Sequence, residues 1–260
     1  MPTLSRLQVY PVKSLDPLAV ESARLTEAGA LALDRRYAMF DEDGAYVNGK
    51  NEARVHRLRS AFDPEANTLS LREHGTDGWR TFDPDADRGV LEDWLADFFG
   101  YPVAVRRDDE QGYPDDTAAG GPTLISTGTL AAVASWFDFD AAEARRRFRP
   151  NLVVDAPAFW EDRLYADRDS TVEFTVGGVE FAGVNPCQRC VVPSRDPETG
   201  AETEGFQRRF VERREATLPE WVDRDWYDHF FRVMVNIRVP GAPGTLAVGD
   251  SVETDAPDAV

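Results

Sequence analysis

The chain has 260 residues, 42% of them hydrophobic, and it carries 29 Lys and Arg against 47 Asp and Glu, which gives a formal net charge of −18. This composition excludes a disordered chain and allows a sizeable core in one large domain or two small ones. Because so acidic a surface repels nucleic acid and anionic membranes, we expect neither as a partner.

The first half of the chain predicts short strands separated by turns. Strands are predicted at residues 4–9, 37–40, 45–47, 58–62, 69–71 and 101–105. Asp43-Gly44 is a turn signal that joins two of these strands in a hairpin, and residues 63–67 join a second hairpin. Apolar residues at helical spacing over 90–99, followed by Gly100 as the C-terminal cap, predict a helix that packs on a sheet.

The second half follows a segment, residues 108–121, whose Asp, Gly and Pro content makes it the best candidate for a linker. Strands are predicted at 124–125, 151–154, 171–176, 179–181 and 233–239, and helices at 130–137 and 141–147. Residues 244–250 return to strand and turn character. The predicted fold class is therefore mainly β with a few helices (α+β), in two connected halves.

Cysteine and lysine usage indicates the cellular environment. The two cysteines cannot build a disulfide framework, no apolar run approaches the ~20 residues of a membrane helix, and residues 1–9 lack the parts of a signal peptide, so we expect a cytoplasmic protein. Lys13 and Lys50 are the only lysines. An acidic, lysine-poor surface suits a protein in concentrated salt, and we predict a halophilic source. Scarce basic residues then carry more information than acidic clusters do.

The most informative motif is Cys187-Gln188-Arg189-Cys190. A zinc site needs four nitrogen or sulfur ligands, and besides these thiols the chain offers only three scattered histidines. A thioredoxin-type pair needs its first Cys at a helix N-terminus, but Val191-Val192-Pro193 does not favour a helix. The pair could also be two buried small hydrophobes. Arg189 favours a thiolate ligand beside an anion-binding arginine, and a soft sulfur donor could complete a metal held by a sulfur-bearing cofactor.

Together with residues 196–200 (DPETG), this motif resembles the signature of the MOSC (molybdenum cofactor sulfurase C-terminal) family. Three further segments resemble that family in the same order: YPVKS at 10–14, FRPN at 148–151 and PGTL at 243–246 running to Gly249-Asp250. Four motifs in order over nearly the whole chain are a specific signal. By layout the chain resembles the amidoxime-reducing components and their bacterial N-hydroxylamine-reducing counterparts.

The resemblance implies an N-terminal MOSC-associated β-barrel domain over 1–112 and a MOSC domain of β-barrel character, with peripheral helices, over 113–256. It implies that Cys190 ligates molybdenum and is the catalytic residue. The residues implied to hold the pterin and its phosphate are Lys13, Ser14, Arg36, Arg149, Asn151 and Arg189. Arginine binds phosphate bidentately and lysine acts as a point charge, so this set suits the anionic cofactor, Mo-molybdopterin, bound between the two halves.

The chain departs from the family pattern at several positions. A hydroxyl-bearing pair that some relatives place before the 124–125 strand is replaced here by Ala119-Gly120-Gly121, whose backbone N–H groups would have to donate instead. Gln188 stands where some relatives have Ser. Some bacterial relatives end in a plant-type ferredoxin domain, which needs four cysteines, and this chain has none to spare.

The implied function is a molybdenum-cofactor oxidoreductase that reduces small N-hydroxylated compounds: hydroxylamines, N-hydroxylated bases or amidoximes. Its electrons would come from a separate iron–sulfur or flavin protein. Asp196, Glu198 and His229 are the candidates for a proton donor. Two alternatives belong to other classes: a carrier that delivers the cofactor or a sulfur atom without turnover, and a binding module that has lost the cofactor.

Overall fold

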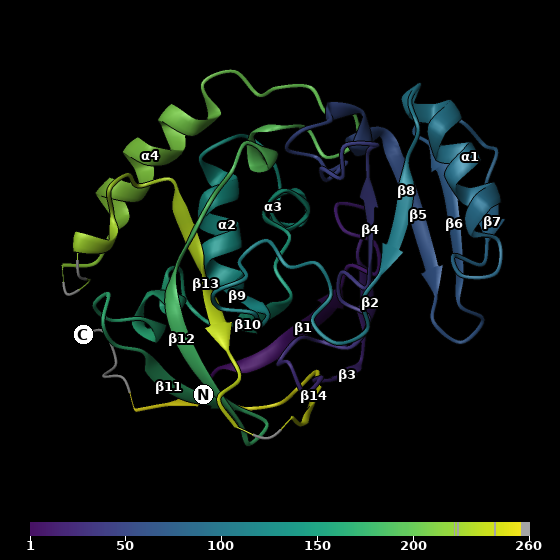
Figure 1. Cartoon of the computed structure of the whole chain (residues 1–260). Helices are drawn as coiled ribbons and strands as arrows, with labels where there is room; N and C mark the ends of the chain where they lie inside the picture. Colours follow the sequence, from purple (N-terminus) through teal and green to yellow (C-terminus); the bar gives the residue numbers. More distant parts are fainter. Residues whose placement is uncertain (221, 223, 242, 256–260) are drawn as a thin grey trace.

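An eight-stranded sheet dominates the computed structural model, which describes residues 1–220, 222, 224–241 and 243–255 (Figure 1). The strand order is β15-β11-β12-β13-β9-β10-β1-β2. The bounds are β1 Thr3–Val9, β2 Leu18–Val20, β9 Thr123–Ser126, β10 Leu152–Asp155, β11 Val172–Val176, β12 Val179–Gln188, β13 Arg232–Arg238 and β15 Val252–Thr254. The β9–β10 pair is parallel, and the other pairs are antiparallel.

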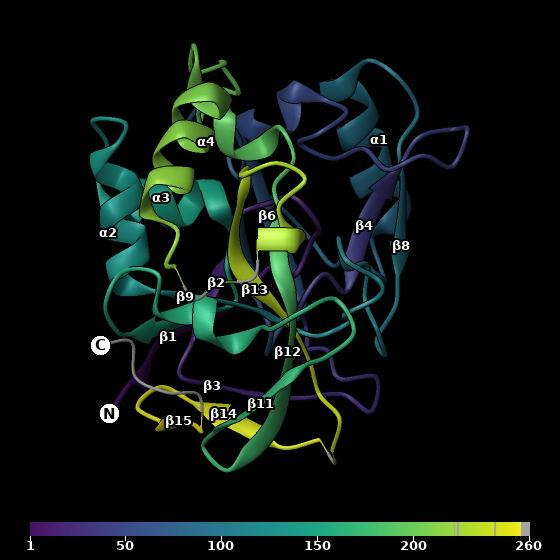
Figure 2. The ribbon, with the colours of Figure 1, turned by 90° about the vertical axis from the view of Figure 1, so that its left-hand side faces the viewer.

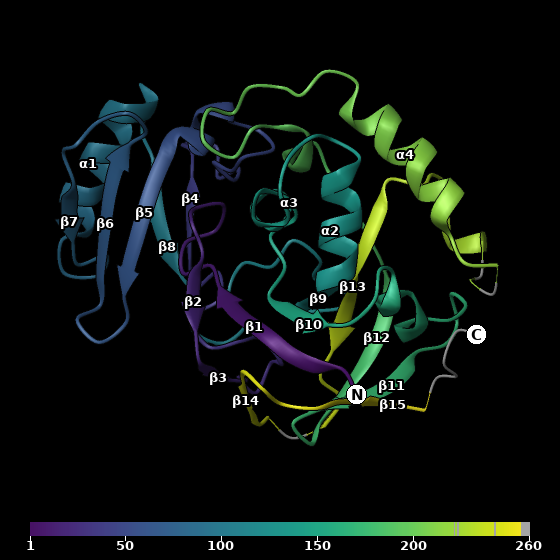
Figure 3. The same cartoon turned by 180° about the vertical axis from the view of Figure 1, so that it is seen from behind.

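The sequence predicted a β-barrel, and the structure corrects this prediction. Among the described residues the sheet does not close, and helices pack on it. Its edge strand β15 approaches β1 at an isolated bridge between Thr3 and Ser251, beside which the Leu4 N–H donates to the Asp250 carbonyl at 2.8 Å and the Val252 N–H donates to the Pro2 carbonyl at 2.9 Å. A barrel needs a continuous ladder of staggered strands, and β15 is only three residues long. Seen from behind, β1 runs from the region of β15 toward β2 (Figure 3).

Three helices cover one side of the sheet (Figure 2): α2 Thr127–Ser135, α3 Ala141–Phe148 and α4 Phe206–Thr217. Helix α2 begins where the Ser126 side chain accepts a hydrogen bond from the Thr129 N–H, a cap that follows β9 directly. Helix α4 was not predicted. It buries Phe206 and Phe210 against a cluster that includes Phe137, whose ring stacks on Phe206 at 4.1 Å.

The first half of the chain adds a second core beside this sheet. The strands of this core are β4 Tyr37–Phe40, β5 Leu58–Asp63, β6 Thr68–Glu73, β7 Arg80–Phe82 and β8 Ala104–Arg107, and its helix is α1 Arg88–Phe99. Strand β3 Ser22–Arg24 pairs with β14 Thr245–Ala247, and both pack on the core of the large sheet. The predicted hairpin over 58–71 and the predicted helix are confirmed, and Gly100 ends α1 in the left-handed conformation with φ 77°. The other predicted hairpin is present only in short form: its arms meet at an antiparallel bridge between Phe40 and Tyr46, and the Val47 N–H donates to the Met39 carbonyl at 2.9 Å, while the full-length partner of β4 is β8.

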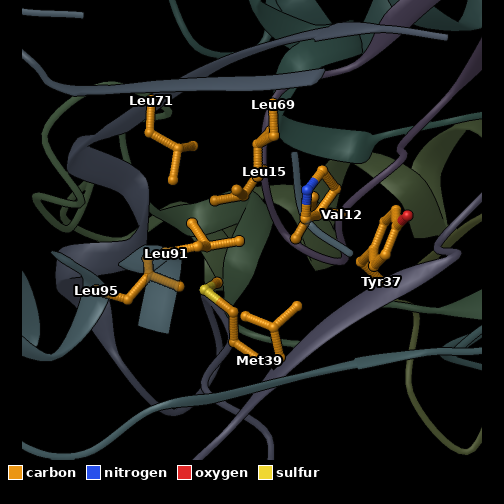
Figure 4. A pocket seen from close by; sticks show the side chains of 10 residues that line it. Val12, Leu15, Tyr37, Met39, Leu69, Leu71, Leu91 and Leu95 are labelled. Atoms are coloured by element: carbon orange, nitrogen blue, oxygen red, sulfur yellow. The ribbon is translucent and has the colours of Figure 1, made fainter. Parts of the chain in front are cut away.

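The second core encloses a small void between α1 and β6 (Figure 4). Its volume is about 10 Å³ and its lining is almost entirely apolar. The labelled side chains that point into it are Val12, Leu15, Tyr37, Met39, Leu69, Leu71, Leu91 and Leu95. A space of this size is at the lower limit for one water molecule, so it is a packing defect of the core and not a ligand site.

The two halves are joined more closely than separate domains would be. Strands β1 and β2, from the first half, lie in the same sheet as strands of the second half, and β3 pairs with β14 near the C-terminus. Single-turn 3-10 helices complete the fold at Ala53–Arg57, Trp160–Leu164, Val192–Ser194 and Arg224–Trp226. In the described part of the chain, no helix is both long and apolar enough to cross a bilayer.

Candidate functional site

A cavity of about 760 Å³ lies between the two halves. Both halves and the 108–121 segment contribute to its lining, which includes nine Lys or Arg residues and three Asp residues in the described chain. The basic residues are Arg35, Lys50, Arg59, Arg146, Arg147, Arg149, Arg189, Arg195 and Arg232. In a protein of net charge −18, this concentration of cations makes the cavity an attractive site for an anion.

Backbone strain is concentrated in the same lining. Eight non-glycine residues of the described chain have a positive φ, and four of them line the cavity: Ser14, Arg35, Arg149 and Met234. Each such residue costs about 1 kcal/mol or more, and residues of this kind gather at binding and active sites. The strained backbone and the concentration of basic residues therefore both indicate this cavity as the candidate functional site.

The two cysteines stand at the end of β12, where the chain turns into the cavity. Cys187 lies in the strand, Arg189 is tied to β13 by its N–H, which donates to the Phe231 carbonyl at 2.9 Å, and Cys190 follows. Both thiols are free, half-buried and part of the lining. Only a three-residue 3-10 helix follows, at Val192–Ser194, and the first Cys sits in a strand, so the geometry does not support a thioredoxin-type site.

The side chain of Arg189 contacts the first thiol of the motif and not the second. Its Nη1 donates to Cys187 Sγ at 3.0 Å and its Nη2 to the Phe148 carbonyl at 3.1 Å, while its Nε is buried without a partner. The Cys190 thiol forms no hydrogen bond with the described residues. Cys190 is therefore the sulfur that remains available to a ligand in the cavity.

The guanidinium groups of Arg149 and Arg35 both form cation–π contacts with the ring of Tyr10. The guanidinium carbon of Arg149 lies 4.1 Å from the centre of the Tyr10 ring, and that of Arg35 lies 5.2 Å from it. Arg149 ends α3 with φ 54°, and its Nη2 donates to the Leu15 carbonyl at 2.8 Å. Burial, with a contribution from the Arg35 cation, lowers the pKa of Arg149. Sequence reasoning missed Tyr10 as a support, although it opens the YPVKS segment.

The structure places Arg35, and not the predicted Arg36, in the cavity. Arg36 is not part of the lining and pairs with Asp109, with 2.7 Å between Nε and Oδ1. Arg35 pairs with Asp34 and also lies 3.9 Å from Asp115 Oδ2. Two adjacent arginines are alike in type, and only the backbone, with Arg35 at φ 51°, decides which one faces the cavity.

Lys13 lies behind the lining and is paired with the segment that was predicted to be a linker. Its side chain is 6% exposed, and its Nζ lies 2.5 Å from Asp115 Oδ1 and 2.9 Å from the Tyr113 carbonyl. Burial lowers the pKa of Lys13, with the Asp115 charge acting in the opposite direction. Burial also raises the pKa of Asp115, but Arg35 and Lys13 outweigh it and bring that pKa down to about 2.

Ser14 and Asn151 both line the cavity, but Asn151 has a structural role there. The Asn151 side chain is fully buried; its Nδ2 donates to the Gln8 carbonyl at 3.2 Å and its Oδ1 accepts from the Thr123 N–H at 3.2 Å. It thus ties β1, β9 and β10 together. Gly121 also lines the cavity, and a Cβ there would lie 2.3 Å from the Ile237 carbonyl oxygen, so this backbone leaves no room for a side chain at position 121.

None of the three predicted proton donors lines the cavity. Asp196 accepts hydrogen bonds within its own turn, Glu198 pairs with Arg146 at 2.9 Å, and His229 Nδ1 accepts from the Phe231 N–H at 3.2 Å. His56 does line the cavity and was missed. Its Nε2 donates to the Gly49 carbonyl at 3.2 Å, and burial lowers its pKa, so the ring is neutral at pH 7.

Two family descriptions match the chain in the order of its halves: "MOSC N-terminal beta barrel domain" over residues 1–89 and "MOSC domain" over residues 123–253. The chain belongs to the MOSC family. The resemblance inferred from four short motifs is thereby confirmed.

Several named relatives are similar to this MOSC protein over most of its length. The molybdenum cofactor sulfurase of Danio rerio is 24% identical over 263 residues, which cover 83% of this chain and 31% of the sulfurase. Mitochondrial amidoxime-reducing component 1 of Danio rerio is 27% identical, covering 76% of this chain and 70% of the relative. Mitochondrial amidoxime reducing component 2 of Bos taurus is 24% identical, covering 76% and 68%.

Proposed function

We propose that this MOSC protein is a molybdenum-cofactor oxidoreductase that reduces N-hydroxylated compounds, such as hydroxylamines, N-hydroxylated bases and amidoximes. A separate iron–sulfur or flavin protein supplies the electrons. The observation that carries the proposal is a free thiol, Cys190, in a large cavity that collects cations in a strongly acidic chain. Similarity to two proteins named amidoxime-reducing components supports the reaction class.

The residues present fit the cofactor. Among the buried side-chain polar atoms without a partner are the Nε atoms of three arginines, Arg189, Arg195 and Arg232, and all three line the cavity. A buried unpaired donor is costly, so these atoms favour an anionic ligand with several acceptors. Cys190 is the soft donor that molybdenum accepts. When bound, the cofactor supplies the two-electron chemistry that removes the hydroxyl oxygen from nitrogen.

The chain's own groups then have separate tasks. Arg149, Arg35 and Lys13 hold the anionic phosphate, and the ring of Tyr10 fixes both guanidinium groups in place. Cys190 ligates the metal through Sγ, and Arg189 holds the neighbouring thiol of Cys187 away from that role. Reduction of R–NH–OH to R–NH2 and water consumes two electrons and two protons. His56 carries its proton on Nε2 and leaves Nδ1 to accept one, which suits a proton relay at the cavity wall.

A second candidate function is a carrier that binds the cofactor or a sulfur atom without turnover. The observation in its favour is the match to a protein named molybdenum cofactor sulfurase, which covers 83% of this chain. A carrier would need the same cavity and the same thiol, so cofactor binding alone does not separate the two functions.

One experiment tests both. The wild type, Cys190→Ser and Cys187→Ser are purified from a host that makes the cofactor, and molybdenum and pterin per chain are measured beside reduction of a hydroxylamine with an artificial electron donor. We expect the wild type and Cys187→Ser to turn over, and Cys190→Ser to lose activity while it keeps the fold. A loaded wild type without turnover would establish the carrier. The reverse pattern of the two variants would overturn the assignment of Cys190.

A further inference from the structure

A carboxylate already sits among the cations that are proposed to hold the phosphate. Asp115 Oδ1 lies 2.5 Å from Lys13 Nζ, and Asp115 Oδ2 lies 3.9 Å from Arg35 Nε. The charge of Arg149 also lowers the pKa of this carboxyl group, although less than Arg35 and Lys13 do. We call Lys13, Arg35 and Arg149 the cation triad. We propose that Asp115 competes with the ligand for the triad and thereby makes the site selective for a doubly charged anion.

The triad needs an anion whether or not a ligand is bound. Burial lowers the pKa of both Lys13 and Arg149, and for each of these two groups the Arg35 cation lowers it further. Asp34 pairs with Arg35 but has no ion pair with the other two. Asp115 is therefore the group that compensates the buried charge of Lys13, and it stabilises the closed arrangement before a ligand arrives.

The position of Asp115 allows the carboxylate to be displaced. The side chain keeps 76% of its surface accessible, because it faces the cavity. The residues on either side are anchored: the Tyr113 N–H donates to the Arg35 carbonyl at 2.9 Å, and Asp116 Oδ2 accepts from Asn236 Nδ2 at 2.8 Å. A rotation of the Asp115 side chain can therefore release Lys13 while these anchors keep the loop in place.

The competition favours a dianion over a monoanion. A pKa near 2 keeps Asp115 charged at every physiological pH, so the carboxylate does not leave by protonation. A singly charged ligand offers the triad no more charge than Asp115 already supplies. A phosphate monoester is close to a dianion at neutral pH and can accept bidentate hydrogen bonds from arginine, so it gains where a monoanion does not. This selectivity rests on the proposed function, in which the triad holds the phosphate of the cofactor.

The test uses the full chain from a host that cannot make the cofactor, with methyl phosphate as the dianionic probe and dimethyl phosphate as the monoanionic one. Affinities are measured by calorimetry at about pH 8 for the wild type, Asp115→Asn, Arg149→Gln and the double variant. Asp109→Asn is the matched control, because Asp109, like Asp115, pairs with two basic side chains, here Arg36 and Arg107, but lies outside the cavity.

We expect Asp115→Asn to bind methyl phosphate about 10- to 100-fold more tightly than the wild type, the factor for one charge-assisted contact. It should also gain measurable affinity for dimethyl phosphate and unfold at a lower temperature, because the triad loses its carboxylate. Asp109→Asn should bind both probes as the wild type does. Equal affinities in wild type and Asp115→Asn, with weaker binding in Arg149→Gln, would overturn the role of Asp115 alone. No weakening in Arg149→Gln, with or without the Asp115 change, would overturn the phosphate site itself.

Discussion

Two arginine environments in this protein differ in what neutralises the charge. Arg214, on α4, is fully buried and pairs with Asp162, with 2.6 Å between Nη2 and Oδ1. The same Nη2 donates to the hydroxyl of Tyr227 at 3.2 Å, and that hydroxyl lies 2.6 Å from the hydroxyl of Tyr165. Burial lowers the pKa of Arg214, but the Asp162 charge outweighs it and raises that pKa above its ordinary value. The charge of this arginine is neutralised by a carboxylate of its own chain, although its Nη1 is buried without a hydrogen-bond partner.

Arg149, at the cavity, is in the opposite situation. Its hydrogen bond goes to a neutral carbonyl, its nearest aromatic support is Tyr10, and it forms no ion pair with a carboxylate of the described chain. Its pKa is lowered, first by burial and also by Arg35. Burial of an arginine therefore does not by itself indicate a ligand site, whereas an arginine without a carboxylate partner in the lining of a cavity is a candidate for one.

The largest expected effect is on stability, at the buried pair of Arg214 and Asp162. Arg214→Ala should lower the free energy of unfolding by about 3–5 kcal/mol, because Asp162 would remain buried without its cation. Urea unfolding followed by circular dichroism measures the change. Arg208→Ala, at an exposed position of the same helix, is the control and should stay within about 0.5 kcal/mol of the wild type. A surface ion pair contributes at most about 1 kcal/mol. A smaller loss of unfolding free energy than this for Arg214→Ala would contradict the importance of the buried pair.

The same network makes stability depend on pH. Glu161 is 1% exposed, and burial, then the charge of Asp162, raises its pKa from 4.5 to about 7. Because the folded value is the higher one, the stability from this group is fully present below about pH 4.5 and is lost as pH rises through about 7. Relative to Glu161→Gln, the wild type should lose about 3 kcal/mol across this window, from the usual value per pKa unit. Unfolding free energies of both proteins at several pH values measure this, and parallel profiles would contradict it.

At the cavity, Arg149→Gln should weaken cofactor binding by about 1.5–3 kcal/mol, or about 10- to 100-fold, since one charge-assisted contact is lost. The apo protein should keep its stability or gain slightly, because a half-buried cation without a carboxylate partner is removed. Molybdenum and pterin per chain after dialysis, together with urea unfolding, separate this result from that of Arg214→Ala. Equal cofactor content in wild type and variant would contradict the role of Arg149 in holding the cofactor.

The smallest effect is expected at Arg36, next to the cavity residue Arg35. Arg36→Gln removes a partly exposed pair with Asp109 and should cost no more than about 1 kcal/mol of stability, with unchanged cofactor content. Arg35→Gln should reduce cofactor content. If Arg36→Gln lowers the content and Arg35→Gln does not, the position predicted from the sequence was the correct one.

Local elements were predictable where a pattern is complete within a short segment. The hairpin over 58–71 and helix α1 follow from period-2 and helical spacing with turn and cap residues in place. Helix α4 was missed although Phe206, Phe210 and Arg214 recur every four residues and share its buried face. The third of these is an arginine, and a charged residue in a buried stripe hides the apolar period.

The family could be recognised from the sequence, and the comparisons confirm it. A sulfur ligand at Cys190 and an anion site at Lys13 and Arg149 were predicted from short motifs, and both stay predictions. Tertiary structure alone decided that Arg35 and not Arg36 enters the cavity, that Arg189 contacts Cys187, and that the supposed linker brings Asp115 to Lys13. The physical reason is that these contacts join residues from separate segments or depend on one backbone angle, and neither is written in local spacing. The bridge between Thr3 and Ser251 likewise joins segments that are almost the whole chain apart.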